Sequence, residues 1–209
     1  MAAIMIRVVG LGGSVSPASK SRSALEAALA GAAGAGADTR LLDLHHLGLP
    51  MFSPTLLADP PASAMELVDA AYGADGLLWS SPMYHGTISG AFKNALDWLY
   101  LLGDRTPPYL TDKVIGLIST AGGTQGLQAV NTMEFIVRSL RGWAVPLVVP
   151  VGPAQRLFDA EGKLQDDAAR RQLMTLGAEV ARVARLFQAG TLAEAEAECE
   201  EAARRAAAA

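Results

Sequence analysis

Residues 4–23, IMIRVVGLGGSVSPASKSRS, are the most informative segment for the fold class. Its first part, Ile4–Leu11, is an aliphatic run of the kind found in a parallel strand buried on both faces. Arg7 interrupts the run, and glycines and serines follow it, so it predicts a strand and not a signal peptide. A buried strand that leads through a Gly/Ser loop into a helix is typical of an α/β fold.

Four further aliphatic runs of strand length follow, each separated from the next by room for a helix. The predicted strands are Ile4–Leu11, Thr39–Leu44, Gly76–Ser80, Val114–Ser119 and Val145–Val149. Helical periodicity predicts helices at Ser23–Ala33, Ser63–Tyr72, Ser89–Leu102, Gln125–Arg141 and Asp166–Gln188. This alternation implies right-handed crossovers and one sheet with helices on both faces.

The length of 209 residues suits a single α/β domain, which we expect over residues 1–190. Residues 191–209 are rich in Ala and Glu and carry little apolar face, so they predict a peripheral helix or a tail. The segment His45–Pro61 contains four prolines and no helical period. We expect a long surface loop there, bordering the site or a subunit contact.

Composition argues against several classes of function. The formal net charge of -4 disfavours a nucleic-acid partner, and the lack of a run of roughly 18 apolar residues argues against a membrane span. The single cysteine, Cys199, cannot form an internal disulfide and suits a reducing cytoplasm. His45 and His46 are adjacent and cannot easily aim both rings at one ion, so no metal site is expected.

Ligands of an open α/β sheet bind beyond the carboxyl ends of the strands where the strand order reverses, here after the first, third and fourth predicted strands. The first of these loops, residues 12–23, is rich in serine and leads to a helix N-terminus, whose dipole favours a phosphate. It lacks the second glycine of a Walker loop and the G-x-G-x-x-G dinucleotide fingerprint. A monophosphate site and an ordinary helix-capping turn both fit this loop.

The other two loops suit a flat ligand. The second, residues 80–90, carries Pro82, Tyr84 and Gly86, which could present backbone amides and an aromatic edge to a planar ring, although a plain turn also fits. The third, residues 119–126, has three glycines in five positions, so a flat ring could approach its backbone, although flexible filler is the alternative. Three such loops on one sheet together predict a ligand site.

These motifs resemble the NAD(P)H-dependent FMN reductase family over about residues 4–188. The motifs that carry the resemblance are Gly13-Ser14 with Ser21-Arg22-Ser23, Ser81–Tyr84 leading to Ser89–Asp97, and Thr120–Gly123. The resemblance implies a flavodoxin-like three-layer sandwich with a five-stranded parallel sheet of order 2-1-3-4-5. It also implies FMN as the cofactor and NADPH or NADH as the co-substrate.

The resemblance further implies roles for individual residues. The FMN phosphate would be held by Ser14, Ser21, Arg22 and Ser23, with Ser16 or Ser19 as helpers. The isoalloxazine and ribityl chain would be bordered by Pro82, Met83, Tyr84 and His85, and the pyrimidine end would meet Thr120, Ala121, Gly122 and Gly123. Many members carry Arg where this chain has Ser16, so Lys20, Arg22 or further amides would compensate. No catalytic side chain is expected, because hydride passes directly to the flavin.

The predicted activity is reduction of FMN by NAD(P)H, with electrons then passing to a flavin-dependent monooxygenase partner or to a small quinone- or azo-type acceptor. The rivals are a flavodoxin-type electron carrier without a nicotinamide site and a non-catalytic protein that kept the fold. Apolar residues on more than one face of the helix Ser89–Leu102 predict burial against something besides the sheet. We therefore expect a homodimer or homotetramer.

Overall fold

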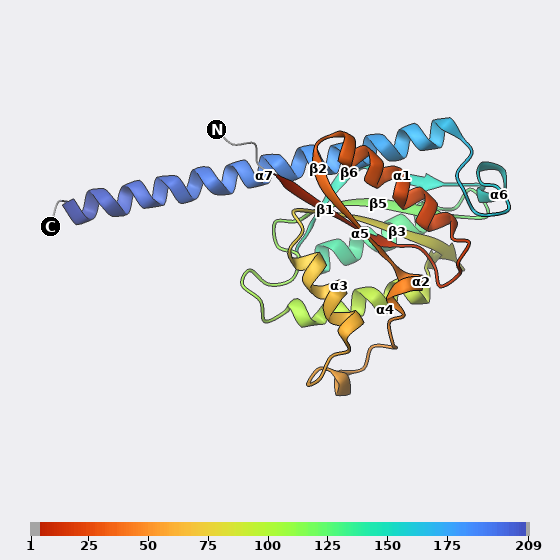
Figure 1. The fold of residues 1–209 in the computed structure, drawn as a ribbon, viewed down its shortest axis with the longest axis horizontal. Helices are drawn as coiled ribbons and strands as arrows, with labels where there is room; N and C mark the ends of the chain where they lie inside the picture. Colours follow the sequence, from red (N-terminus) through yellow and green to blue (C-terminus); the bar gives the residue numbers. More distant parts are fainter. Residues whose placement is uncertain (1–4, 208–209) are drawn as a thin grey trace.

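The computed structural model describes residues 5–207 and shows one parallel sheet between two layers of helices (Figure 1). Five parallel strands lie in the order β2-β1-β3-β5-β6, which confirms the expected flavodoxin-like topology. A sixth, β4, was not predicted and pairs antiparallel with the end of β3. The strands are β1 Ile6–Gly12, β2 Ala37–Asp43, β3 Gly76–Tyr84, β4 Thr87–Ile88, β5 Val114–Thr120 and β6 Trp143–Val151.

The helices divide between the two faces of the sheet. One core lies beneath α1 and α7, and the other beneath α3, α4 and α5 (Figure 1). Their bounds are α1 Lys20–Gly34, α2 Leu44–Leu47, α3 Ala62–Tyr72, α4 Gly90–Trp98, α5 Leu127–Ser139, α6 Ala154–Leu157 and α7 Asp167–Ala207, with short 3-10 turns η1 Pro54–Leu56 and η2 Leu99–Leu102. The expected three-layer arrangement is therefore present.

Burial on both faces explains why the central strands are aliphatic throughout. In β3, Leu77 and Trp79 belong to the core under α3–α5, whereas Leu78 belongs to the core under α1 and α7. Close packing of α1 on α7 requires glycine, because a Cβ at Gly177 would lie 1.8 Å from the carbonyl oxygen of Ala28. The sheet is thus packed against helices on both faces, and the carboxyl ends of its strands position the loops.

The segment His45–Pro61 is more ordered than the expected surface loop. It includes most of α2 and all of η1. Its Pro50 carbonyl accepts hydrogen bonds from Asn94 Nδ2 at 2.9 Å and Trp98 Nε1 at 3.1 Å. The Phe52 ring packs edge-on against Trp98, with centroids 5.3 Å apart. Prolines hid these short elements, because they break the helical period on which the prediction relied.

This segment also corrects the argument for a subunit contact. Most apolar side chains of α4 and η2 that predicted an external partner are buried within the chain itself, namely Phe92, Trp98, Leu99 and Leu102, whereas Leu101 is half-buried. The segment Pro50–Phe52 and α3 cover these side chains, so no second protomer is needed to bury them. The apolar pattern correctly indicates burial, but the cover comes from other segments of the same chain.

The last helix does not stop near Gln188 as expected. α7 continues without a break through Gly190 to Ala207 and extends beyond the sheet (Figure 1). The Ala, Glu and Arg residues there have strong helix propensity, and one glycine costs only about 1 kcal/mol. Cys199 lies in this stretch, and its side chain is outside the part of the chain whose side chains the structure describes. In residues 5–207, none of the helices has the length and apolar character needed to cross a bilayer.

Candidate functional site

The three predicted loops all follow the carboxyl ends of neighbouring strands. Gly12 at the end of β1 pairs with Ser80 of β3, and Pro82 of β3 pairs with Thr120 at the end of β5. The Gly13 N–H donates to the Ser80 carbonyl at 3.2 Å. The loops after β1, β3 and β5 therefore begin from neighbouring positions on the sheet.

Buried hydroxyl groups tie these loops together. Ser21 Oγ and Thr120 Oγ1 lie 2.6 Å apart, which joins the first turn of α1 to the end of β5. Ser80 Oγ donates to the Ser21 carbonyl at 2.8 Å. All three side chains are buried, so these bonds fix the relative position of the loops without interference from solvent.

Several serine hydroxyls of the first loop form hydrogen bonds within the protein. Ser19 caps α1 by accepting from the Arg22 N–H at 3.2 Å, so the helix begins at Lys20, earlier than expected. Ser23 Oγ accepts from the Leu164 N–H at 3.0 Å, which fastens the turn before α7 to this loop. The hydroxyls of Ser21 and Ser23 are therefore both engaged by other parts of the chain.

Two serines of the same loop remain more open. Ser14 is half-buried, and its Oγ accepts from the Ser16 N–H at 3.2 Å. Ser16 itself is exposed. This pair lies between the buried start of the loop and the N-terminus of α1, where backbone N–H groups and the helix dipole favour an anion.

Arg22 is shared between two carboxylates. Its Nε lies 2.9 Å from Glu26 Oε1, and its Nη1 lies 3.3 Å from Oδ2 of Asp43. The Asp43 side chain is 4% exposed, and its Oδ2 also lies 2.9 Å from His46 Nδ1. Both contacts to Oδ2 are at ion-pair distance, but neither has the geometry of a hydrogen bond. The charge of Arg22 is thus partly neutralised within the protein.

Asp43 is a site residue that the sequence analysis missed. It ends β2, caps α2 by accepting from the His45 N–H at 3.2 Å, and lies against the first loop. A Cβ at Gly13 would be 2.8 Å from Asp43 Oδ1, and Gly13 has φ of +93°, so only glycine fits there without strain. The signal available in the sequence was a lone carboxylate at the end of a predicted strand.

The second loop is a hairpin rather than a plain turn. β3 extends through Pro82 and Met83 to Tyr84, which pairs with Thr87 of β4. His85 and Gly86 form the turn, with φ of 50° and 83°. The Tyr84 side chain is exposed at this rim, whereas Pro82 is buried and Met83 half-buried. The hairpin therefore presents an exposed aromatic side chain beyond the end of β3, the strand that pairs with β5.

The third loop presents bare backbone. Ala121 is fixed, because its N–H donates to the Val151 carbonyl at 2.9 Å and its own carbonyl accepts from the Ala154 N–H at 2.8 Å. The residues that follow, 122–125, are exposed. A Cβ at Gly123 would meet no atom within 4 Å, so a flat ligand has free access to the backbone there. Gln155, a second residue that the sequence analysis missed, lies against Gly122.

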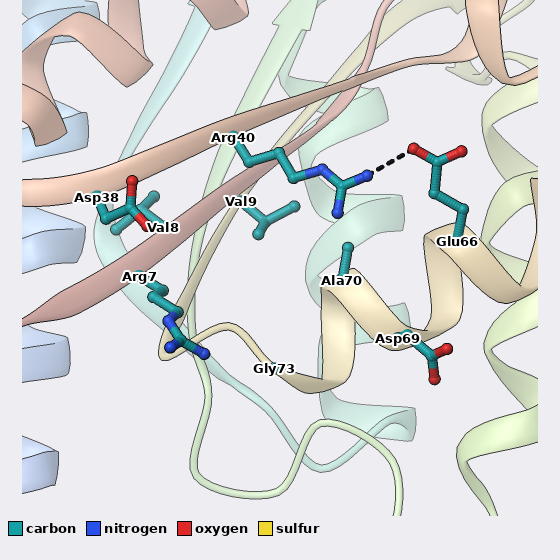
Figure 2. Close-up of a pocket in the computed structure, with 9 residues that line it drawn as sticks. All are labelled: Arg7, Val8, Val9, Asp38, Arg40, Glu66, Asp69, Ala70 and Gly73. Atoms are coloured by element: carbon teal, nitrogen blue, oxygen red, sulfur yellow. Dashed lines mark hydrogen bonds and ion pairs between the residues drawn. The ribbon is translucent and has the colours of Figure 1, made fainter.

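Cavities lie at both ends of the sheet. A cavity of about 490 Å³ borders the first loop and α4, and its lining includes Val15, His45, Met51 and Ala91. At the opposite end, a cleft of about 330 Å³ lies between α3 and the first halves of β1 and β2. Figure 2 shows Arg40 reaching across this cleft to Glu66, at 2.5 Å. The three loops contribute no residue to the lining of this second cleft.

The geometry can be compared with known proteins. A family model described as NADPH-dependent FMN reductase matches residues 6–155, a range that contains all three loops. The chain belongs to the NADPH-dependent FMN reductase family. Membership confirms the resemblance carried by the loop motifs. The last residue of the family match is Gln155, whose side chain lies beside Gly122.

Individual relatives share parts of the chain. The NAD(P)H-dependent FMN reductase PA1204 of Pseudomonas aeruginosa is 31% identical over 171 residues, which is 79% of this chain and 88% of that protein. The NADPH-dependent FMN reductase ArsH of Acidithiobacillus ferrooxidans is 32% identical over 133 residues, or 64% of this chain. The match spans only 54% of the length of ArsH.

Solved structures agree on the fold of this FMN reductase family member. FerB from Paracoccus denitrificans, a flavoenzyme NAD(P)H:(acceptor) oxidoreductase, has a TM-score of 0.70 at 20% identity and covers 88% of this chain and 99% of its own. RosB has a TM-score of 0.71 at 15% identity, with 96% and 87% covered. At these identities the likeness concerns the fold alone.

Proposed function

We propose that this chain binds FMN at the carboxyl edge of its sheet and reduces it with NADPH or NADH. The observation that carries the proposal is the Ser21–Thr120 hydroxyl pair, which holds a serine-rich helix N-terminus next to an exposed glycine backbone. The first suits a phosphate and the second a flat ring. FMN carries both groups at opposite ends of one molecule.

Within this proposal, the residues of the first loop divide their work. Ser14 and Ser16 bind the phosphate directly, together with amides at the start of α1, because they are the more open serines of the loop. Ser21 and Ser23 shape the loop through their bonds to Thr120 and Leu164. Arg22 attracts the phosphate with its positive charge, which its contacts with Asp43 and Glu26 neutralise only in part.

The other two loops bind the ring. The isoalloxazine is bordered by Pro82, Met83, Tyr84 and His85, and its pyrimidine end meets Thr120, Ala121, Gly122 and Gly123. When bound, FMN supplies the hydride-accepting chemistry, so the chain needs no catalytic side chain. Its residues instead position the two rings in contact and direct backbone N–H dipoles at the pyrimidine, where reduction places negative charge.

The electron acceptor in this proposal is a small quinone- or azo-type molecule or the flavin of a monooxygenase partner. An FMN-dependent NADPH-azoreductase of Staphylococcus aureus is 41% identical over 81 residues, 39% of this chain and 40% of that one, which favours the small acceptor.

We place the protein in the cytoplasm. A homodimer or homotetramer remains part of the proposal, supported now by the exposed Tyr84 and Phe135 instead of by α4.

One spectroscopic experiment tests the proposal. The purified protein is mixed with FMN without oxygen, NADPH or NADH is added, and absorbance is followed near 450 nm, roughly where oxidised flavin absorbs. Rapid bleaching is expected, and Arg40→Ala at the far end of the sheet should bleach like the wild type. Binding without bleaching would indicate an electron carrier, and failure to bind FMN would overturn the proposal.

A further inference from the structure

Gln155 lies beside the third loop because of strand pairing, not sequence proximity. The pairing of Thr120 with Val151 brings the residues after β6 next to those after β5. The two backbone hydrogen bonds between Ala121 and the pair Val151 and Ala154 then fix the start of α6 against this loop. Gln155, the second residue of α6, is consequently held at a defined position.

The side chain of Gln155 lies over the exposed backbone of Gly122. A Cβ at Gly122 would be 3.0 Å from Gln155 Nε2 and 3.9 Å from its Oε1. Gln155 is exposed, and its carboxamide makes no hydrogen bond with the residues that the structure describes. The Gln155 side chain therefore offers one donor group and one acceptor group beside Gly122, where the proposal puts the pyrimidine end of the flavin.

We propose that Gln155 hydrogen-bonds the pyrimidine edge of bound FMN and so influences both its affinity and its reduction potential. This inference rests on the proposed function. The pyrimidine edge of a flavin alternates carbonyl acceptors with one N–H donor, and a carboxamide offers one group of each kind. Donation from Nε2 to a ring carbonyl strengthens when the ring gains negative charge, so Gln155 favours the reduced flavin.

Two substitutions of similar shape separate hydrogen bonding from packing. Gln155→Met keeps the length of the side chain and removes both polar groups, whereas Gln155→Glu removes the donor and adds a negative charge near the reduced ring. Arg156→Gln, at an exposed position on the same turn, is the matched control. Neither Gln155 nor Arg156 is buried, so the variants should fold like the wild type.

The readouts are the dissociation constant for oxidised FMN, from flavin fluorescence, and the midpoint potential of the bound flavin. We expect Gln155→Met to weaken FMN binding about tenfold, the effect of losing one or two hydrogen bonds. Both variants should lower the midpoint potential, because both lose the donor that favours the reduced flavin. Gln155→Glu should lower it further, because its negative charge also disfavours the reduced anion. Arg156→Gln should change neither quantity.

A double variant tests the contact itself. In Gly122→Ala the new methyl group displaces the Gln155 amide, so this change should weaken FMN binding strongly in the wild type and less in Gln155→Met. Additive losses, or Gln155 variants with wild-type affinity and potential, would overturn the inference. A wild-type protein that fails to bind FMN would instead refute the proposed function, so the two failures are distinguishable.

Discussion

The two ends of the sheet differ in how they use polar groups. At the carboxyl end, buried hydroxyls join the strands, and the glycines beyond them leave backbone exposed. At the amino end, charges pair with one another, as in Arg40 with Glu66 (Figure 2) and in Arg105 with Asp69. At the carboxyl end Arg22 also pairs with carboxylates, but the groups that join the strands there are neutral and residues 122–125 are exposed, so backbone N–H groups are available to a ligand. This difference supports the proposal that the ligand binds at the carboxyl end.

The largest expected effect is that of Gly12→Ala at the carboxyl end. A Cβ at Gly12 would lie 2.2 Å from the Ser80 carbonyl oxygen, so β1 and β3 would have to separate where the first two loops begin. We expect a loss of about 3 kcal/mol in the free energy of unfolding and loss of FMN binding. Urea denaturation measures the first and fluorescence titration the second.

Gly34→Ala is the control for this change, because a Cβ there meets no atom within 4 Å. It should leave both stability and FMN binding intact. Wild-type stability in Gly12→Ala would show that the strands at this end tolerate separation, contrary to the comparison.

The next largest effect concerns the hydroxyl pair. Ser21→Ala or Thr120→Val leaves the partner hydroxyl buried without its bond, which costs about 1–3 kcal/mol, and the double variant should lose less than the sum. Arg40→Ala at the amino end should cost at most about 1 kcal/mol, because its ion pair is exposed. Urea denaturation of the four variants checks this ranking, and equal losses at both ends would contradict it.

A smaller effect is expected from the carboxylates around Arg22. Glu26→Gln releases the exposed partner of Arg22, so FMN should bind about threefold more tightly, and the gain should shrink at high salt. Arg22→Ala should weaken binding by a similar factor. Titrations with FMN and with riboflavin separate the phosphate contribution, and tighter riboflavin binding in Glu26→Gln would argue against it.

The smallest effect is a pH dependence at the amino end. Burial lowers the pKa of Lys113, against the opposing influence of Asp75 and Asp112, and its Nζ donates to the Ala74 carbonyl at 2.6 Å. The unfolded chain then binds more protons just below the ordinary lysine pKa, so the free energy of unfolding rises with pH in that window. Lys113→Met should remove the rise. Urea midpoints at several alkaline pH values measure it, and parallel curves would contradict the assignment.

The aliphatic runs of the sequence were sufficient for the layers, because successive side chains such as Leu77 and Leu78 are buried on opposite faces of the sheet. The strand order was implied by the resemblance to the family, and the structure confirms it. The sequence was also sufficient for the three loops, since their position follows from the direction of the strands. It did not reveal β4, whose two residues form a strand only by pairing with the end of β3. A two-residue sequence pattern does not indicate which strand it pairs with.

Contacts between distant segments were missed for the same reason. Asp43 reaches Arg22, and Gln155 reaches Gly122, only because the sheet aligns the ends of neighbouring strands. The apolar face of α4 was recognised, but its cover by Pro50–Phe52 depends on hydrogen bonds that this segment makes with Asn94 and Trp98. A pattern shows that a side chain is buried and not which segment buries it.

The central claim is that the loops after β1, β3 and β5 form one binding site for FMN, and a crystal structure of the complex tests it most directly. The account predicts the phosphate at Ser14, Ser16 and the start of α1, with the pyrimidine edge at Gly122, Gly123 and Gln155. FMN bound in the cleft between α3 and β2, or with its ring away from the third loop, would contradict the account.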